Sequence, residues 1–72
     1  MFLKTHAYGG NTILVNLEDV SCISHSSANG TKITYKDDNE YKPLESITDI
    51  MNALREANLL IDPNPDPGTY NY

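Results

Sequence analysis

The sequence contains no tryptophan, a single phenylalanine and a single cysteine, and only 5 of its 72 residues are basic. One cysteine, Cys22, cannot form an intrachain disulfide, which excludes the disulfide-stapled modules common among small secreted proteins. The basic residues are outnumbered by 10 acidic ones, and the net charge is −5. Because an acidic chain repels phosphate backbones, we expect no nucleic-acid partner.

Long hydrophobic runs are also missing. No apolar run exceeds three residues, as in Ile13-Leu14-Val15 and Leu59-Leu60-Ile61. A transmembrane helix needs about 20 apolar residues, and a signal peptide needs an apolar core of about 7–15 residues. We therefore expect neither kind of segment, no membrane partner, and a cytoplasmic protein.

The length of 72 residues allows one small hydrophobic core. Such a core usually supplies only about 3–5 kcal/mol of net stability. A two-domain enzyme with a cleft between its lobes is therefore excluded. Without disulfides, a chain of this size needs either a well-idealised fold or added stability from a partner or from copies of itself.

Alternating apolar and polar residues, separated by turn residues, predict several short strands. Thr31, Ile33 and Tyr35 fall on one face of such a strand, which is typical of a half-buried antiparallel sheet. The Asn29-Gly30 pair is a strong hairpin signal. The predicted strands cover residues 2–8, 12–16, 20–25, 31–36 and 40–42, with turns at 9–11 and 37–39 between them. Both faces of the strand at 12–16 are apolar, so we expect both to be covered.

A helix is predicted over about residues 46–58. Ser46 can cap its first turn, and apolar residues recur at helical spacing; they are Ile47, Ile50, Met51, Leu54 and Ala57. The expected fold is therefore α+β: a small antiparallel β-sheet or open barrel of four to five strands, followed by one C-terminal helix. Residues 1–61 form the predicted domain, and the proline-rich residues 62–72 form an extended or disordered tail.

This order of elements resembles the small FlbD-type proteins associated with flagella and swarming motility. The resemblance covers about residues 3–57 and is a match of pattern. It is carried by Gly10 in the first turn, the apolar strand from Ile13 to Asn16, the segments Leu17 to Ile23, Lys32 to Tyr35 and Asn39 to Tyr41, and the helical region Glu45 to Leu54. The resemblance implies the same strand-rich fold and a role in motility.

The sequence is also similar, more loosely, to the β-domain of LytTR-type transcription regulators, in which a strand pair is likewise followed by a short helix. That family binds DNA through basic loops. Here the predicted hairpin at residues 26–30 contains no arginine or lysine, so we expect no DNA binding.

Residues suited to chemistry are few. His6, Cys22 and His25 are the only soft metal ligands, and their spacing does not match a zinc site. We expect Cys22 to be a buried thiol, His25 a surface imidazole, and no metal or other cofactor. Neither a nucleophile motif nor a glycine-rich phosphate loop is present, so we expect a protein that is not an enzyme.

Two functional hypotheses remain open. In the first, the chain is a homo-oligomeric accessory or regulatory module that binds another protein. Its expected interface comprises Ile13, Leu14, Val15, Leu59, Leu60 and Ile61, with Tyr70 and Tyr72 as a docking tail. In the second, the chain binds or sequesters a nucleotide-like or anionic small molecule between subunits, a role that would suit a protein of a mobile element. The residues suited to that ligand are Tyr8, His25, Ser26, Ser27 and Asn29.

Overall fold

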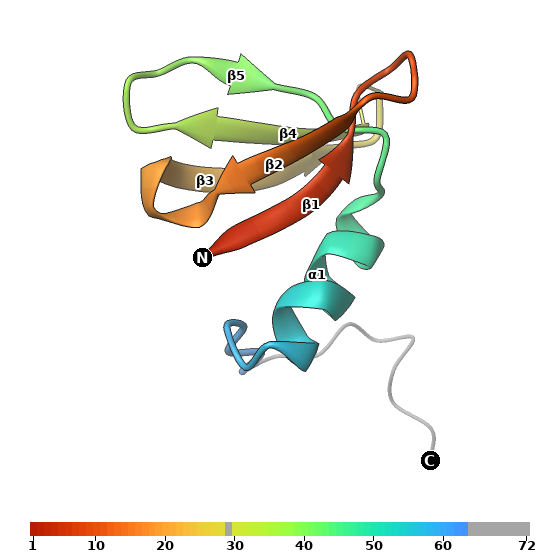
Figure 1. Ribbon diagram of the computed structural model, residues 1–72. Coiled ribbons are helices and arrows are strands. Elements are labelled where there is room, and N and C mark those ends of the chain that lie inside the picture. The colour runs from red at the N-terminus through yellow and green to blue at the C-terminus, as the bar shows by residue number, and fades with distance from the viewer. Residues whose placement is uncertain (29, 64–72) are drawn as a thin grey trace.

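The computed structural model describes residues 1–28 and 30–63 (Figure 1). The elements in chain order are β1 (Phe2–His6), β2 (Thr12–Asn16), the 3-10 helix η1 (Leu17–Asp19), β3 (Val20–Ser26), β4 (Gly30–Tyr35), β5 (Glu40–Tyr41) and α1 (Ile47–Glu56). The described chain is thus a small α+β domain, as the sequence predicts. Its strands form two antiparallel sheets, in the orders β1–β2 and β3–β4–β5, where one sheet was expected. The open barrel stays a prediction, and most of the predicted tail, residues 64–72, lies outside the described chain.

The β1–β2 hairpin has one buried and one open face. Leu3 lies opposite Val15, and Lys4 lies opposite Leu14 in the antiparallel register. Because successive residues of a strand point to opposite faces, Leu3 and Val15 face the core while Phe2, Lys4 and Leu14 face outward. Val15 is 1% exposed, whereas Leu14 is 61% exposed. The sequence predicts that both faces of β2 are covered. Within the described chain only the face that carries Val15 is covered.

A bulge decides which side chains of β3 face the core. The pairing register shifts between Val20 and Cys22, so that Val20 pairs with Tyr35 and Ile23 pairs with Ile33. The inserted residue reverses the alternation, and Val20 and Ile23 both pack against the core. Cys22 then points outward and is exposed. The prediction of a buried thiol was wrong for this reason, whereas His25 is exposed as expected.

The core joins both sheets to the helix. Its buried apolar members are Leu3, Val15, Ile33 and Ile50. A polar link completes it: the Thr5 hydroxyl donates to the carbonyl oxygen of Ile13 at 2.9 Å and lies 2.8 Å from the Tyr41 hydroxyl. With its own proton directed at Ile13, the Thr5 oxygen accepts from Tyr41. This hydrogen bond connects β1 of one sheet to β5 of the other.

Both ends of α1 follow the signals in the sequence. The Ser46 hydroxyl oxygen accepts the backbone N–H of Asp49 at 3.1 Å, which is the predicted N-cap. At the other end Asn58 has φ of 59°, and the N–H groups of Asn58 and Leu59 donate to the carbonyls of Arg55 and Leu54. This Schellman arrangement ends the helix near the predicted point. Within the described part of the chain, no helix has the length and apolar character needed to cross a membrane.

Candidate interaction surface

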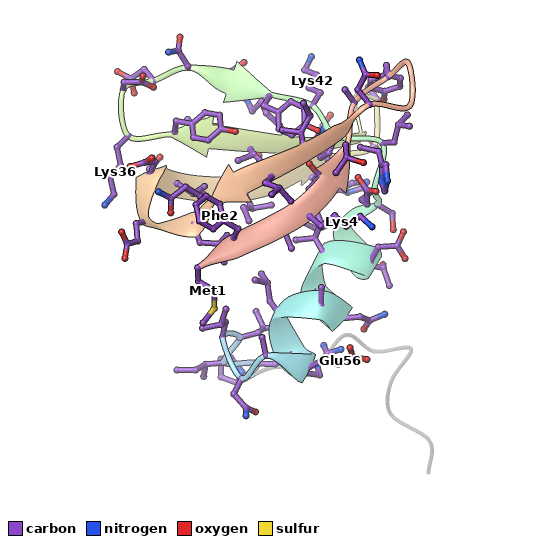
Figure 2. All side chains as sticks on the ribbon, in the orientation of Figure 1. Met1, Phe2, Lys4, Lys36, Lys42 and Glu56 are labelled. Carbon is purple, nitrogen blue, oxygen red and sulfur yellow. The ribbon has the colours of Figure 1, made fainter. Side chains whose placement is uncertain are left out.

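Large apolar side chains are exposed around β1 and the end of α1. Phe2 and Met1 are each 64% exposed, and Leu14 lies diagonally across the hairpin from Phe2 on the same outward face. Figure 2 shows the Met1 side chain extending from the start of β1 toward the segment that follows α1. Leu59, in that segment, is also exposed. Met1, Phe2 and Leu59 line one groove, and Leu14 lies with Phe2 on the outward face of the hairpin. We call Met1, Phe2, Leu14 and Leu59 together the exposed apolar surface.

A groove between β1 and α1 adjoins this surface. Its volume is about 260 Å³, and its lining is almost entirely apolar: Met1, Phe2, Leu3, Lys4, Leu17, Ala53, Leu54, Ala57 and Leu59. Two features of the chain create the groove. The small side chains of Ala53 and Ala57 leave space beside the helix, and the left-handed residue Asn58 turns Leu59 back toward β1. We call this feature the β1–α1 groove.

The edge of β1 that faces away from β2 lies beside the β1–α1 groove, and part of its backbone has no hydrogen-bond partner within the described chain. In an antiparallel ladder the backbone groups of alternate residues point to opposite edges. The Met1 carbonyl accepts the Leu17 N–H, and the Ala7 N–H donates to the Asn11 carbonyl. The backbone groups of the odd-numbered residues of β1 therefore point toward β2. The backbone groups of Phe2 and Lys4 therefore point outward, and no hydrogen bond within residues 1–28 and 30–63 reaches them from that side.

A carboxylate clamp closes the same edge at His6. The Glu45 carboxylate accepts the His6 backbone N–H at 2.7 Å and lies 2.6 Å from its ring nitrogen Nδ1, while the Leu44 N–H donates to the His6 carbonyl. The side-chain hydrogen bond from His6 is the main cause that lowers the pKa of Glu45 below its ordinary value; burial opposes it. The clamp fixes the start of the α1 segment to the end of β1.

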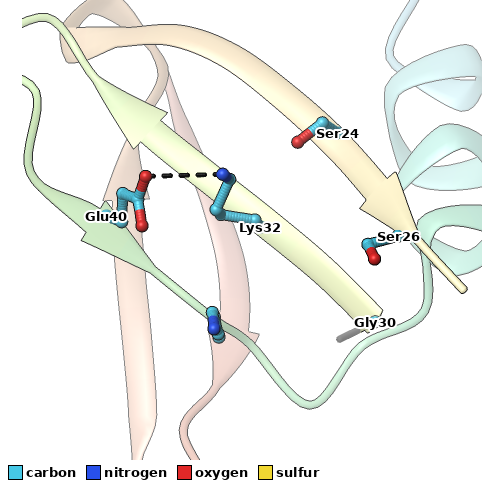
Figure 3. Close-up of a pocket in the computed structure, with 6 residues that line it drawn as sticks. Ser24, Ser26, Gly30, Lys32 and Glu40 are labelled. Atoms are coloured by element: carbon cyan, nitrogen blue, oxygen red, sulfur yellow. Dashed lines mark ion pairs between the residues drawn. The ribbon is translucent and has the colours of Figure 1, made fainter. Parts of the chain in front are cut away.

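A second, polar hollow lies on the outward face of the three-stranded sheet (Figure 3). Its volume is about 130 Å³, and it is lined by Ser24, Ser26, Gly30, Lys32, Glu40 and Lys42. It exists because Gly30 has no side chain and stands opposite Ser26, between longer residues. The Lys32 ammonium is 3.4 Å from the Glu40 carboxylate. For Lys42, no ion pair is found within the described chain. We call this feature the serine–lysine hollow.

A third hollow, of about 340 Å³, is lined by Asp19, Tyr35, Lys36 and Asp37. Burial, and then the negative charges of Tyr41, Asp19 and Asp37, raise the pKa of Tyr35 above its ordinary value. Neither in these hollows nor elsewhere do the described residues contain a group of three or more His, Cys, Asp or Glu side chains placed to hold a metal ion.

The structure separates several of the residues that the sequence suggested for a small-molecule site. Ser26 lines the serine–lysine hollow, whereas its neighbour His25 pairs with Thr31 and lies on the other face of β3. Tyr8 is exposed in the β1–β2 turn, and Ser27 is exposed in the turn after β3. Asn29 lies outside the described residues.

The suggested interface residues also divide. Leu14 and Leu59 belong to the exposed apolar surface, and Ile61 is 90% exposed. Val15 is a core residue, and Ile13 and Leu60 are half-buried. Tyr70 and Tyr72 lie outside the described residues. Sequence reasoning missed Met1, Phe2 and the His6–Glu45 clamp, because these depend on which segments meet in space; the only signal was the apolar start of the chain.

Comparisons with family models, curated proteins and solved structures found no match to this chain. The resemblance to FlbD-type and LytTR-type proteins therefore stays a prediction.

Proposed function

We propose that the protein is a small cytoplasmic interaction module that assembles with copies of itself and has no enzymatic activity. The observation that carries this proposal is the exposed apolar surface at the start of β1 and on the outward face of the β1–β2 hairpin. Monomeric soluble proteins rarely leave large side chains clustered in this way without a partner. A copy of the chain is the partner we favour, because a single core of this size has little stability to spare. The assembled form then acts as an accessory or regulatory protein by binding another protein.

Burial of the exposed side chains supplies the driving force. Phe2 and Leu14 protrude from the same outward face of the β1–β2 hairpin. Covering one such side chain completely is worth about 1.5–3 kcal/mol. In a symmetric assembly every copy contributes the same side chains, so the free energy gained by burying each one is counted at least twice. The summed gain competes with the entropy lost on association, which is several kcal/mol.

The test is the mass of the purified protein in solution, measured by native mass spectrometry and by light scattering after size exclusion. We expect an oligomer for the wild type and a monomer for Leu14→Asp, since a carboxylate at this position would be buried without a partner. Thr12→Asp is the matched control, because Thr12 is exposed on the same face of the same strand but lies nearer the β1–β2 turn. A wild-type monomer, or an oligomer that both variants leave intact, would contradict the proposal.

A second candidate function, binding of a small anionic ligand, is favoured by one specific observation. The serine–lysine hollow places two hydroxyl groups and two ammonium groups on one outward face of a chain whose net charge is −5. The hydroxyl of Ser26 accepts the Ala28 N–H at 3.3 Å, which leaves its own proton free to donate. These are the groups that bind phosphate or carboxylate oxygens.

Titration with inorganic phosphate at constant ionic strength tests this candidate, followed by the NMR signals of the Ser24, Ser26 and Gly30 amides. We expect Lys42→Gln to weaken binding and Glu40→Gln to strengthen it, because the latter releases Lys32 from its ion pair. Lys36→Gln and Glu18→Gln make the same charge changes away from the hollow and serve as controls. If the hollow variants and their controls change phosphate binding equally, the binding depends only on the net charge of the protein, and the proposed site is wrong.

A further inference from the structure

We propose that the β1–α1 groove binds a medium-chain fatty acid, with the carboxylate of the ligand at Lys4 and its hydrocarbon chain along α1. This inference goes beyond the proposed function and does not depend on self-assembly, because Leu14 is not part of the groove lining. Leu14 therefore stays available to a second copy when the groove is filled. Three features of the groove carry the inference: the backbone of β1, the charge of Lys4, and the apolar lining between the strand and the helix.

One wall of the groove is the backbone of β1, and part of this wall lacks hydrogen-bond partners. The N–H groups of Phe2 and Lys4 point away from β2, and nothing within residues 1–28 and 30–63 accepts them. A second strand is excluded here, because α1 runs beside this edge of β1 (Figure 1). A small ligand needs no such space and can still supply a single acceptor atom. A donor without a partner beside apolar side chains favours a ligand that brings one.

The same edge of β1 already binds a carboxylate two residues further on. At His6, one oxygen of Glu45 accepts the backbone N–H at 2.7 Å, and the other lies 2.6 Å from the ring nitrogen Nδ1 of the same residue. Lys4 offers a similar pair of groups, because its N–H points to the same edge and its side chain ends in an ammonium. A ligand carboxylate can therefore bond one oxygen to the Lys4 N–H and the other to the Lys4 ammonium.

The charge of Lys4 selects an acid as the ligand. Lys4 is the one charged residue of the groove lining, and its ammonium has no ion pair within the described chain. Glu45, two residues along the strand at a spacing of about 7 Å, is held by His6 and leaves this ammonium unpaired. Hydrogen bonds from an N–H group or an ammonium to a carboxylate are roughly twice as strong as those between neutral groups. We therefore expect the groove to prefer an acid to an alcohol of the same chain length.

The apolar part of the groove suits a short unbranched chain. Its strand side extends from Lys4 to Met1, and its helix side runs along Ala53 and Ala57. Three residues of a strand span about 10 Å, which is close to the length of an extended chain of about eight carbons with bonds of about 1.5 Å. The groove volume of about 260 Å³ is below the range of about 300–1,000 Å³ that is typical of pockets for drug-sized ligands. Octanoate has the length and the head group that fit.

Titration with octanoate, followed by the amide NMR signals of the isotope-labelled protein, tests the site. We expect the Lys4 amide proton to move downfield, because it gains a carboxylate acceptor, and the signals of Ala53 and Ala57 to move with the same dissociation constant. From hexanoate to octanoate the affinity should rise about fourfold for each added methylene. Octanol lacks the carboxylate and acetate lacks the chain, so both should bind about tenfold more weakly or less.

Two substitutions each remove one feature of the site. Ala53→Leu fills the groove and should abolish octanoate binding, whereas Asn52→Leu adds the same side chain at an exposed position outside the lining and is the control. Lys4→Gln removes the ammonium and should weaken octanoate binding by about three- to tenfold without changing octanol binding. Lys42→Gln makes the same charge change at the serine–lysine hollow and is its control. All four positions are exposed, so the fold does not depend on their side chains.

Several results would overturn the inference. If octanol binds as tightly as octanoate, or if Lys4→Gln and Lys42→Gln weaken octanoate binding equally, Lys4 does not recognise the carboxylate. If Ala53→Leu binds octanoate as well as Asn52→Leu does, or if the Lys4 amide signal does not move, the ligand is not in the groove.

The Leu14→Asp variant separates this inference from the proposed function. It should bind octanoate as the wild type does, because Leu14 lies outside the groove lining. If the wild type is a monomer that binds octanoate at Lys4, the groove site stands and self-assembly is wrong. If the wild type is an oligomer that ignores octanoate, self-assembly stands and the groove site is wrong. Loss of octanoate binding in Leu14→Asp would mean that one copy does not hold a complete site, which overturns the inference.

Discussion

At the scale of single residues, Glu45 makes an unusually specific contact. Its two carboxylate oxygens bind the backbone and the ring of His6, which joins the end of β1 to the segment before α1. The lowered pKa of Glu45 means that the folded protein favours the charged carboxylate more than the unfolded chain does. The contact therefore stabilises the fold above the ordinary pKa of 4.5, and this stabilisation is lost as pH falls through the lowered value.

We predict that Glu45→Gln lowers the free energy of unfolding at pH 7 by about 1–3 kcal/mol, since it removes a hydrogen bond to a charged group. The difference from wild type should shrink as pH falls below 4.5, because the wild-type carboxyl then becomes neutral too. Urea unfolding between pH 3 and pH 7 measures both effects. Glu56→Gln, on the exposed side of α1, is the control. A difference that stays constant with pH would show that the charge of Glu45 is not involved.

Thr31 is the opposite case, a buried polar group without a partner. Its side chain is 4% exposed, and its Oγ1 has no hydrogen-bond partner among the residues described. Leaving such a hydroxyl unsatisfied costs about 1–3 kcal/mol. We predict that Thr31→Val, which keeps the shape of the side chain, raises the free energy of unfolding by about 1 kcal/mol. Urea denaturation at pH 7 measures this change.

Thr5→Val is the matched comparison, because Thr5 is equally buried but its hydroxyl bonds to both Ile13 and Tyr41. That substitution should destabilise the protein, since it leaves the Tyr41 hydroxyl without its partner. If the two valine variants lose stability equally, the Thr31 hydroxyl is hydrogen-bonded in solution and the prediction is wrong.

At the scale of elements, the helix depends on the signals at its ends. Its 10 residues are fewer than the about 12–15 that an isolated helix needs to be even marginally stable, so capping and packing together decide its stability. We predict that Ser46→Ala lowers the free energy of unfolding by about 1 kcal/mol, because the Asp49 N–H loses its acceptor. Ser46→Asn should restore most of the loss, since asparagine also caps well. Thermal unfolding followed by circular dichroism measures both, and equal losses for alanine and asparagine would contradict a capping role.

The elements themselves were largely predictable because their signals are local. The turn residues, the alternation at Thr31 to Tyr35 and the Ser46 cap each act within a few positions, and the structure confirms the strands and the helix they indicate. The bulge between Val20 and Cys22 was not predictable in this way. It depends on how β3 pairs with β4, and a shift of one residue reverses which side chains are buried. Cys22 was placed on the wrong side for that reason.

At the scale of the whole molecule, the candidate surface could be predicted only in part. Leu14 was identified because the strand around it is apolar on both faces, and it is exposed. Phe2 was not identified, since its role depends on lying diagonally across the hairpin from Leu14 and beside a groove built by α1. Local patterns indicate which side chains lack cover. The tertiary arrangement determines which of them lie together.

Assembly and folding should therefore be coupled, and this gives the last prediction. If copies bury Phe2 and Leu14 against one another, the oligomer is more stable than the monomer, and raising the protein concentration favours the folded state by mass action. For a dimer, a tenfold increase contributes about 1.4 kcal/mol per dimer, or about 0.7 kcal/mol per chain, and each kcal/mol per chain shifts the melting temperature of a domain this small by about 4–8 °C. We expect the wild-type melting temperature, measured by calorimetry over a hundredfold range of concentration, to rise by several degrees.

Leu14→Asp removes the coupling without touching the core, because Leu14 points away from it. Its melting temperature should be lower than that of the wild type at high concentration and independent of concentration, whereas Thr12→Asp should keep the wild-type slope. A wild-type melting temperature that does not change with concentration would mean that the exposed apolar surface gains nothing from a second copy. The surface would then have to serve a different protein, and the proposed self-assembly would be wrong.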